Sequence, residues 1–185
     1  RRPKEKTADQ GETTTDLRPP DPIYSEQQIL TTIEELFSKP DRGSSESPPR
    51  AVILGAAGSG KSTLLAHLLH RAAAEELRTG DGRPWLPVFI SLPGLAGYFR
   101  GHPADREPTL DGYLTQRCTD AGLGPAPEQG WRAWWRDRLD QGVLLLLDAL
   151  DETPIGEMAA VRRRVLDNTG LERCAMLLSC RTTQF

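Results

Sequence analysis

The chain has 185 residues, 37% of them hydrophobic, and a formal net charge of −3. This length suggests one domain, and the negative charge offers no overall attraction to nucleic acid. Three consecutive arginines at 162–164 would spread over most of a helix circumference, which is typical of a solvated surface. No apolar run approaches the ~20 residues that a membrane-spanning helix needs. We therefore expect neither nucleic acid nor a membrane among the partners.

The N-terminal quarter of the chain differs in composition from the rest. Residues 1–22 are charged and punctuated by proline, so we expect a disordered tail. Within residues 23–49, a capping-box pattern and helical apolar spacing predict an amphipathic helix from Ser25 to Ser38, followed by a linker. The chain lacks an initiator Met and a secretory signal, so we expect a fragment of a longer protein.

Residues 50–185 alternate between strand and helix patterns. Short apolar runs predict strands at 51–54, 85–92, 143–147 and 175–179, the third buried on both faces. Helical patterns follow the first strand as far as Gly80 and recur at 110–121, 131–139 and 157–168. This alternation predicts an α/β fold, a three-layer sandwich with a mostly parallel central sheet. We expect the tryptophans of 131–139 to pack that helix on the sheet.

The cysteines predict a reducing environment. Cys118, Cys174 and Cys180 have no metal-binding or redox spacing, and their odd number argues against a closed disulfide framework. Reduced, buried thiols are typical of a cytoplasmic protein, so we expect that localisation.

A phosphate-binding loop follows the first predicted strand. The segment fits GxxxxGK[ST] at every fixed position, and it reads Gly55, Ala56, Ala57, Gly58, Ser59, Gly60, Lys61, Ser62, followed by Thr63. Glycines let the backbone approach a triphosphate closely and adopt positive φ, and the next helix points unpaired N–H groups at the anion. Lys61 supplies a charge for the β- and γ-phosphates. Ser62 is placed to ligate Mg²⁺, and Thr63 lies near the α-phosphate.

Acidic residues follow the buried strand. Asp148 directly ends the apolar run 143–147, at the edge where open α/β sheets bind ligands, and it is the expected Mg²⁺ partner. Glu152 is the candidate general base for an attacking water. Asp151 could share that role or orient the metal shell, and both residues could instead cap the next segment. Arg181 ends the last predicted strand at the same edge, where it could contact the γ-phosphate.

The interval between Lys61 and Asp148 matches P-loop ATPases in which a strand is inserted between those of the phosphate loop and the Asp. A Ras-type GTPase would need NKxD, but the chain's single Asn, Asn168, is not followed by Lys. The run LLLLDALDE at 144–152 resembles the extended Walker B motif of NACHT domains, in the STAND class of signalling P-loop NTPases. LPVFISL at 86–92 and LLSCR at 177–181 are similar to that family's second strand and to its sensor 1 strand, which ends in Arg.

The resemblance covers roughly residues 50–185 and implies specific roles. Lys61 and Ser62 would bind phosphate and Mg²⁺, and Asp148 would serve the metal. Asp151 and Glu152 would serve hydrolysis, and Arg181 would sense the γ-phosphate. The family usually has Gly where Ala149 stands.

Members of that family are switches in innate or antiphage immunity. An ADP-bound closed form gives way to an ATP-bound form that self-associates and activates a fused effector. In that family a helical domain and a winged-helix domain follow the sensor 1 strand, and we expect these, the effector and the sensor repeats to lie outside this chain. We expect slow ATP hydrolysis, or none from the fragment alone. A metabolic P-loop kinase and a non-catalytic, nucleotide-bound interaction module are the alternatives.

Overall fold

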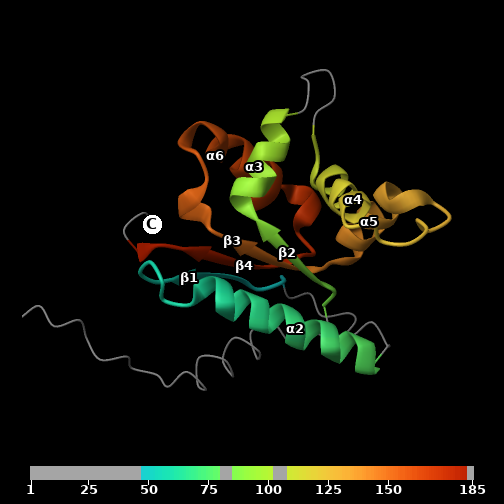
Figure 1. Ribbon diagram of the computed structural model, residues 1–185, viewed down its shortest axis with the longest axis horizontal. Coiled ribbons are helices and arrows are strands. Elements are labelled where there is room, and N and C mark those ends of the chain that lie inside the picture. The colour runs from blue at the N-terminus through green and yellow to red at the C-terminus, as the bar shows by residue number, and fades with distance from the viewer. Residues whose placement is uncertain (1–46, 80–84, 102–107, 183–185) are drawn as a thin grey trace, which may run out of the picture.

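The computed structural model describes residues 47–79, 85–101 and 108–182. The predicted tail at 1–22 and the predicted helix between Ser25 and Ser38 lie outside these ranges. The described part is an α/β fold built around one parallel sheet (Figure 1).

The sheet contains four described strands. They are β1 (Arg50–Leu54), β2 (Pro87–Ser91), β3 (Leu144–Asp148) and β4 (Ala175–Cys180). All neighbouring pairs are parallel, in the spatial order β1-β4-β3-β2. The last strand in sequence therefore lies between the strand of the phosphate loop and the strand that ends in Asp148. This is the inserted-strand arrangement that the spacing of the motifs predicts.

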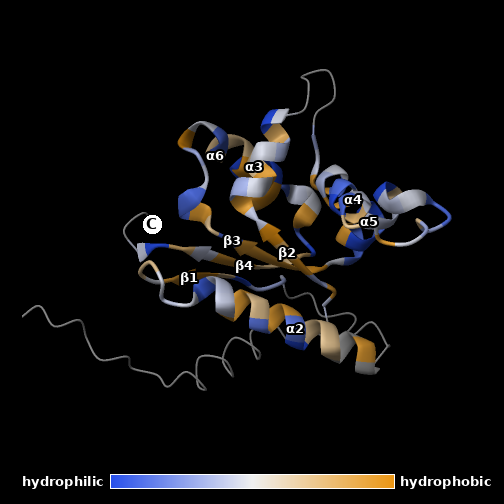
Figure 2. Cartoon of the chain, viewed as in Figure 1, coloured by the Kyte–Doolittle hydropathy of each residue, from blue (hydrophilic) through white to orange (hydrophobic). Residues whose placement is uncertain are grey.

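Helices cover both faces of the sheet, which gives the predicted three layers. Helix α2 (Lys61–Thr79) lies along one face, and α3 (Leu92–Gly101) and α6 (Ile155–Val161) lie on the other (Figure 1). Side chains of β3 alternate between the two sides. Leu144 and Leu146 join the cluster under α2, whereas Leu145 and Leu147 join the larger cluster on the opposite face. The apolar run of β3 is therefore buried on both sides. Figure 2 shows this strand in the orange of hydrophobic residues.

Helix α3 is an element that the sequence analysis missed. It begins directly after β2 and contains Pro93 and three glycines, a composition with low helix propensity. Its buried residues nevertheless recur at helical spacing, and they are Leu92, Leu95, Ala96 and Phe99. Burial of this apolar stripe against the core outweighs the weak local preference, so tertiary packing decides the structure here.

Two helices pack together beside the sheet, α4 (Leu110–Asp120) and α5 (Gly130–Gln141). Trp135 on α5 packs against the large core cluster, which contains residues of the sheet, as predicted, and it also contacts α4. Trp135 donates a hydrogen bond from its indole N–H to the Sγ atom of Cys118 on α4, at 3.3 Å. Trp134 meets Trp131 and Trp135 edge to face.

The helix predicted at 157–168 begins earlier and changes type. Helix α6 continues into a π-helical turn, η2 (Arg162–Leu166), and short 3₁₀ turns η1 (Leu150–Glu152) and η3 (Thr169–Leu171) complete the chain order. Within the arginine run, Arg162 and Arg163 are exposed, as expected of a solvated surface. Arg164 is half-buried, with its guanidinium carbon 4.9 Å from the centroid of the Phe99 ring.

Candidate functional site

The loop between β1 and α2 needs glycine at particular positions. Gly58 and Gly60 have φ angles of 73° and 84°, in the left-handed region that other residues avoid. At Gly55 the restriction is space, because a Cβ atom there would lie 2.5 Å from the Oγ atom of Ser59. The glycines thus permit the turn and the close approach of backbone that a phosphate cradle requires.

Lys61 folds over the start of this loop. Its ammonium donates hydrogen bonds to the carbonyl oxygens of Gly55 and Ala56, at 2.9 and 2.8 Å. An ammonium group has three donors, so a third N–H is available for a phosphate oxygen. The N–H of Gly55 donates to the carbonyl oxygen of Cys180 at 3.3 Å, which ties the loop to the end of β4.

Helix α2 begins at Lys61, so its first turn faces the loop. Ser62 and Thr63 are exposed there, with their hydroxyls available to a ligand. The first N–H groups of a helix lack intrahelical acceptors and carry the positive end of the helix dipole. This end of α2 is suited to an anion.

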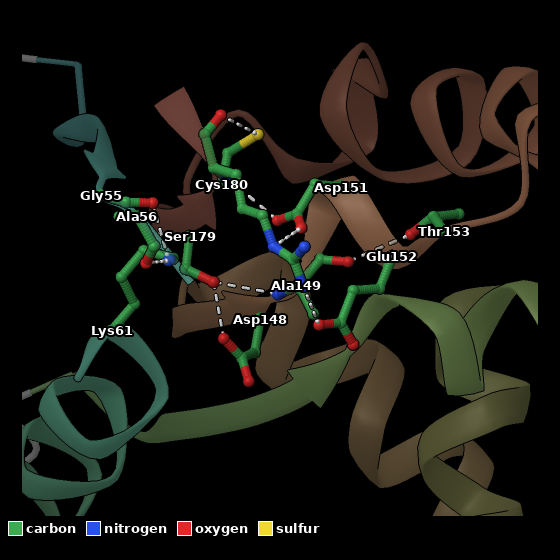
Figure 3. A network of polar contacts seen from close by, with 11 residues as sticks. Gly55, Ala56, Lys61, Asp148, Ala149, Asp151, Glu152, Thr153, Ser179 and Cys180 are labelled. Atoms are coloured by element: carbon green, nitrogen blue, oxygen red, sulfur yellow. Dashed lines mark hydrogen bonds and ion pairs between the residues drawn. The ribbon is translucent and has the colours of Figure 1, made fainter. Parts of the chain in front are cut away.

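Asp148 is held by a serine from the neighbouring strand (Figure 3). The Ser179 hydroxyl donates to Oδ1 of Asp148 at 2.5 Å and accepts the N–H of Ala149 at 2.9 Å. Only 1% of Ser179 is exposed. The parallel register places β3 beside β4, with Leu147 opposite Leu178, so the next residues of the two strands meet. The carboxylate that ends β3 is thereby fixed in direction.

Arg181 bridges the two other acids. Its Nε atom lies 2.8 Å from Oδ2 of Asp151, and its Nη2 atom lies 3.1 Å from Oε1 of Glu152. Its backbone N–H also donates to Oδ1 of Asp151 at 3.1 Å. The side chain of Asp151 is 4% exposed, whereas that of Glu152 is 58% exposed. Asp151 is therefore buried, whereas the next residue, Glu152, is open to solvent.

These groups surround one cavity of about 260 Å³ at the carboxyl edge of the sheet. The cavity brings together every predicted site residue except Gly55 and Ala56, which support the loop through their carbonyls. Its lining residues are Ala57, Gly58, Ser59, Gly60, Lys61, Ser62, Thr63, Asp148, Ala149, Asp151, Glu152, Ser179 and Arg181.

The donor set fits a magnesium-bound phosphate group. Ser62 contributes a hydroxyl and Asp148 a carboxylate, and Mg²⁺ prefers such oxygen ligands while keeping several waters. Lys61, Arg181 and the start of α2 provide the positive charge that phosphate oxygens need. These are the residues that could hold the metal and the anion.

Two lining residues, Ala149 and Ser179, were not predicted from the sequence. Ser179 is a hydroxyl within an otherwise apolar strand, which is the signal that could have identified it. Ala149 has a φ of 64°, and it is the one described non-glycine residue with positive φ. An alanine gives no sequence signal for that conformation.

Cys118, Cys174 and Cys180 are free and buried, as predicted. Burial raises the pKa of the Cys180 thiol, and the nearby charge of Asp151 raises it further. This thiol next to the cavity therefore stays protonated near neutral pH and is a poor nucleophile.

Comparison with known families gives one match that spans the cavity. The family model described as NACHT domain matches residues 50–185, which include the phosphate loop, the acidic residues and Arg181. No curated protein matches the chain. No helix in the described ranges combines the length and apolarity needed to cross a bilayer.

Proposed function

The chain belongs to the NACHT domain family, and from that premise we propose that it is the nucleotide-binding core of a STAND-class signalling ATPase. Family membership itself implies a P-loop NTPase domain that binds nucleotide. The observation that carries the finer proposal is the shared cavity, in which the phosphate loop, Asp148, Glu152 and Arg181 converge. The ligand would be ATP or ADP with Mg²⁺.

In this proposal the loop and α2 bind the phosphates. Backbone N–H groups of Gly58 to Lys61 surround the anion, and Lys61 extends its remaining donor to the β- and γ-phosphates. Ser62 and Asp148 would hold Mg²⁺, which when bound would supply positive charge for the phosphate oxygens. Ser179 keeps Asp148 aimed at that position through its 2.5 Å hydrogen bond.

Glu152 is the proposed general base. It is the most exposed acid at the cavity, and Arg181 contacts its Oε1 atom. The carboxylate has a second oxygen that can accept a proton from an attacking water. Arg181 would stabilise negative charge on the transferred γ-phosphoryl group.

The γ-phosphate makes this site a switch. A triphosphate offers Arg181 and Lys61 contacts that a diphosphate does not, so it stabilises a different state of the domain. We propose that the ATP-bound state self-associates and activates fused domains, in the cytoplasm, where the free buried cysteines would remain reduced.

Turnover by a Glu152→Gln variant tests the base assignment. We expect ATP hydrolysis to slow by roughly 10²-fold or more, since general-base catalysis contributes at least that factor, while ATP stays bound. Glu157→Gln is the matched control, because Glu157 pairs with Arg100 outside the cavity. Hydrolysis at the wild-type rate in Glu152→Gln would remove Glu152 from this role.

A further inference from the structure

The two acids that follow Asp148 differ in what they can do. Asp151 and Glu152 are adjacent, and the resemblance assigns hydrolysis to both. In the structure, 4% of the Asp151 side chain is exposed, against 58% of Glu152. Both oxygens of Asp151 accept a hydrogen bond or ion pair from Arg181, one from the side chain and one from the backbone N–H. A general base must reach a water, and Asp151 has both oxygens engaged.

From this geometry we infer that Asp151 is the positioning residue that anchors Arg181, and that Glu152 is the contact that Arg181 exchanges for the γ-phosphate. The inference rests on the proposed function, since it needs a nucleotide in the cavity. Asp151 acts through Arg181 and touches neither substrate nor metal in this assignment.

The anchor is strong because the Asp151 carboxylate is buried and accepts two contacts from Arg181. A carboxylate removed from water needs close partners, and losing one leaves its charge uncompensated. Asp151 holds Arg181 at two points, the backbone at the end of β4 and Nε of the guanidinium. Together the two contacts fix where the chain leaves the sheet and in which direction the guanidinium points.

The second contact is weak by comparison. Glu152 and Arg181 are 58% and 42% exposed, and ion pairs between exposed side chains contribute little free energy. Arginine has five N–H donors, of which Nε faces Asp151 and one on Nη2 faces Glu152. Arg181 lines the same cavity as the phosphate loop, so its other donors are within the site where a phosphate would bind. Arg181 can therefore leave Glu152 for a phosphate oxygen without leaving Asp151, and the same exchange frees Glu152 to bind water.

A double-mutant cycle with nucleotide selectivity as its readout tests the anchor. The variants are Asp151→Asn, Arg181→Gln and their combination in the full chain, with Glu152→Gln as the neighbouring control. Affinities for ADP and for a non-hydrolysable ATP analogue are measured by calorimetry with Mg²⁺. We expect Asp151→Asn and Arg181→Gln each to weaken analogue binding by about tenfold, the effect of one hydrogen bond to a charged group, with ADP affinity unchanged.

The combined variant should lose no more affinity for the analogue than the weaker-binding single variant, because both changes break the same Asp151–Arg181 interaction. Glu152→Gln should bind the analogue at least as tightly as the wild type, because it removes only the contact that Arg181 gives up. Additive losses, or an Asp151→Asn variant that keeps its selectivity and loses only turnover, would overturn the assignment.

Thermal unfolding of the same variants without nucleotide gives an independent reading. We expect Asp151→Asn and Arg181→Gln to lower Tm non-additively, and additive shifts in Tm would refute the anchor. If the wild-type chain bound neither nucleotide, the proposed function would fail, and the unfolding cycle alone would decide whether Asp151 anchors Arg181.

Discussion

Ser179 contributes a single hydroxyl that links two strands at the site. It donates to Asp148 and accepts from the N–H of Ala149, inside a strand whose other residues are apolar or Cys. Neither contact follows from the sequence, because both depend on β4 lying beside β3. The sequence predicted Asp148 itself, since a carboxylate ending a buried strand needs a partner.

We predict that Ser179→Ala weakens the Mg²⁺-dependent part of nucleotide affinity by roughly tenfold. The change leaves Asp148 without its orienting donor and the Ala149 N–H without its acceptor. Titrations with and without Mg²⁺ measure the effect. Ser179→Thr, which keeps the hydroxyl, should restore affinity. Thr119→Ala, at an exposed position of α4 outside the cavity lining, should change little. Equal losses in Ser179→Thr and Ser179→Ala would contradict the role of the hydroxyl.

Ala149 adopts a left-handed conformation, with φ 64° and ψ 52°, at the turn between β3 and η1. This region disfavours residues with a Cβ atom and suits glycine. The strain lies directly beside Asp148, where the chain must turn sharply to bring Asp151 and Glu152 to the cavity. This strain gives a physical reason for the glycine that NACHT domains usually have at this position.

We predict that Ala149→Gly raises the free energy of unfolding by about 0.5–1 kcal/mol, because relief of strain exceeds the added entropy of the unfolded chain. Chemical denaturation measures it. Ala159→Gly, the same change at an exposed position within α6, should instead lower stability by about 0.5–1 kcal/mol. A loss of stability in both variants would show that Ala149 is not strained.

At the scale of elements, the strands were easier to predict than the helices. Four strands appear within one or two residues of their predicted positions, because buried apolar runs and loop signals mark them. Helix α3 was missed because its glycines and Pro93 give it a low helix propensity. Its apolar stripe stabilises the helix only when it packs against the assembled core. The role of the tryptophans on α5 also depended on the partner helix, which the spacing of residues does not reveal.

Asp111 joins the helices α4 and α5. It is 8% exposed, and Arg132 and Arg136 on α5 lie 2.9 and 3.3 Å from its Oδ2 atom. Burial by itself would raise the pKa of this carboxyl. Hydrogen bonds from Thr109 and Arg132, with the positive charges of the two arginines, outweigh burial and hold the pKa below its ordinary value.

We predict that Asp111→Asn lowers the free energy of unfolding by about 1.5–3 kcal/mol at pH 7, the range for hydrogen bonds to charged groups. Because the folded-state pKa is lowered, the wild-type contribution is present above the unfolded pKa of about 3.9 and is lost as pH falls through the folded pKa. The difference between the proteins should therefore shrink below about pH 4. Denaturation curves across pH measure it, and a difference that stayed undiminished as the pH fell below the unfolded pKa would contradict the linkage.

At the scale of the whole molecule, parallel strands bring distant segments to one edge. Residues near 55, 148 and 181 come from three different strands, and all of them end at the cavity. The motifs predicted this meeting, since ligands bind beyond the carboxyl ends of strands in open α/β sheets. They did not predict that Arg181 pairs with both acids, because ion pairing depends on side-chain positions that no spacing specifies.

The central claim is that this cavity binds a magnesium nucleotide through the phosphate loop. Isothermal titration of the full chain with ADP and Mg²⁺ tests it most directly, with Lys61→Ala as the variant and His67→Ala, an exposed change on the same helix, as the control. We predict saturable binding by the wild type and by His67→Ala, reduced affinity when Mg²⁺ is removed, and no detectable binding by Lys61→Ala. Binding by Lys61→Ala equal to that of the wild type would contradict the account.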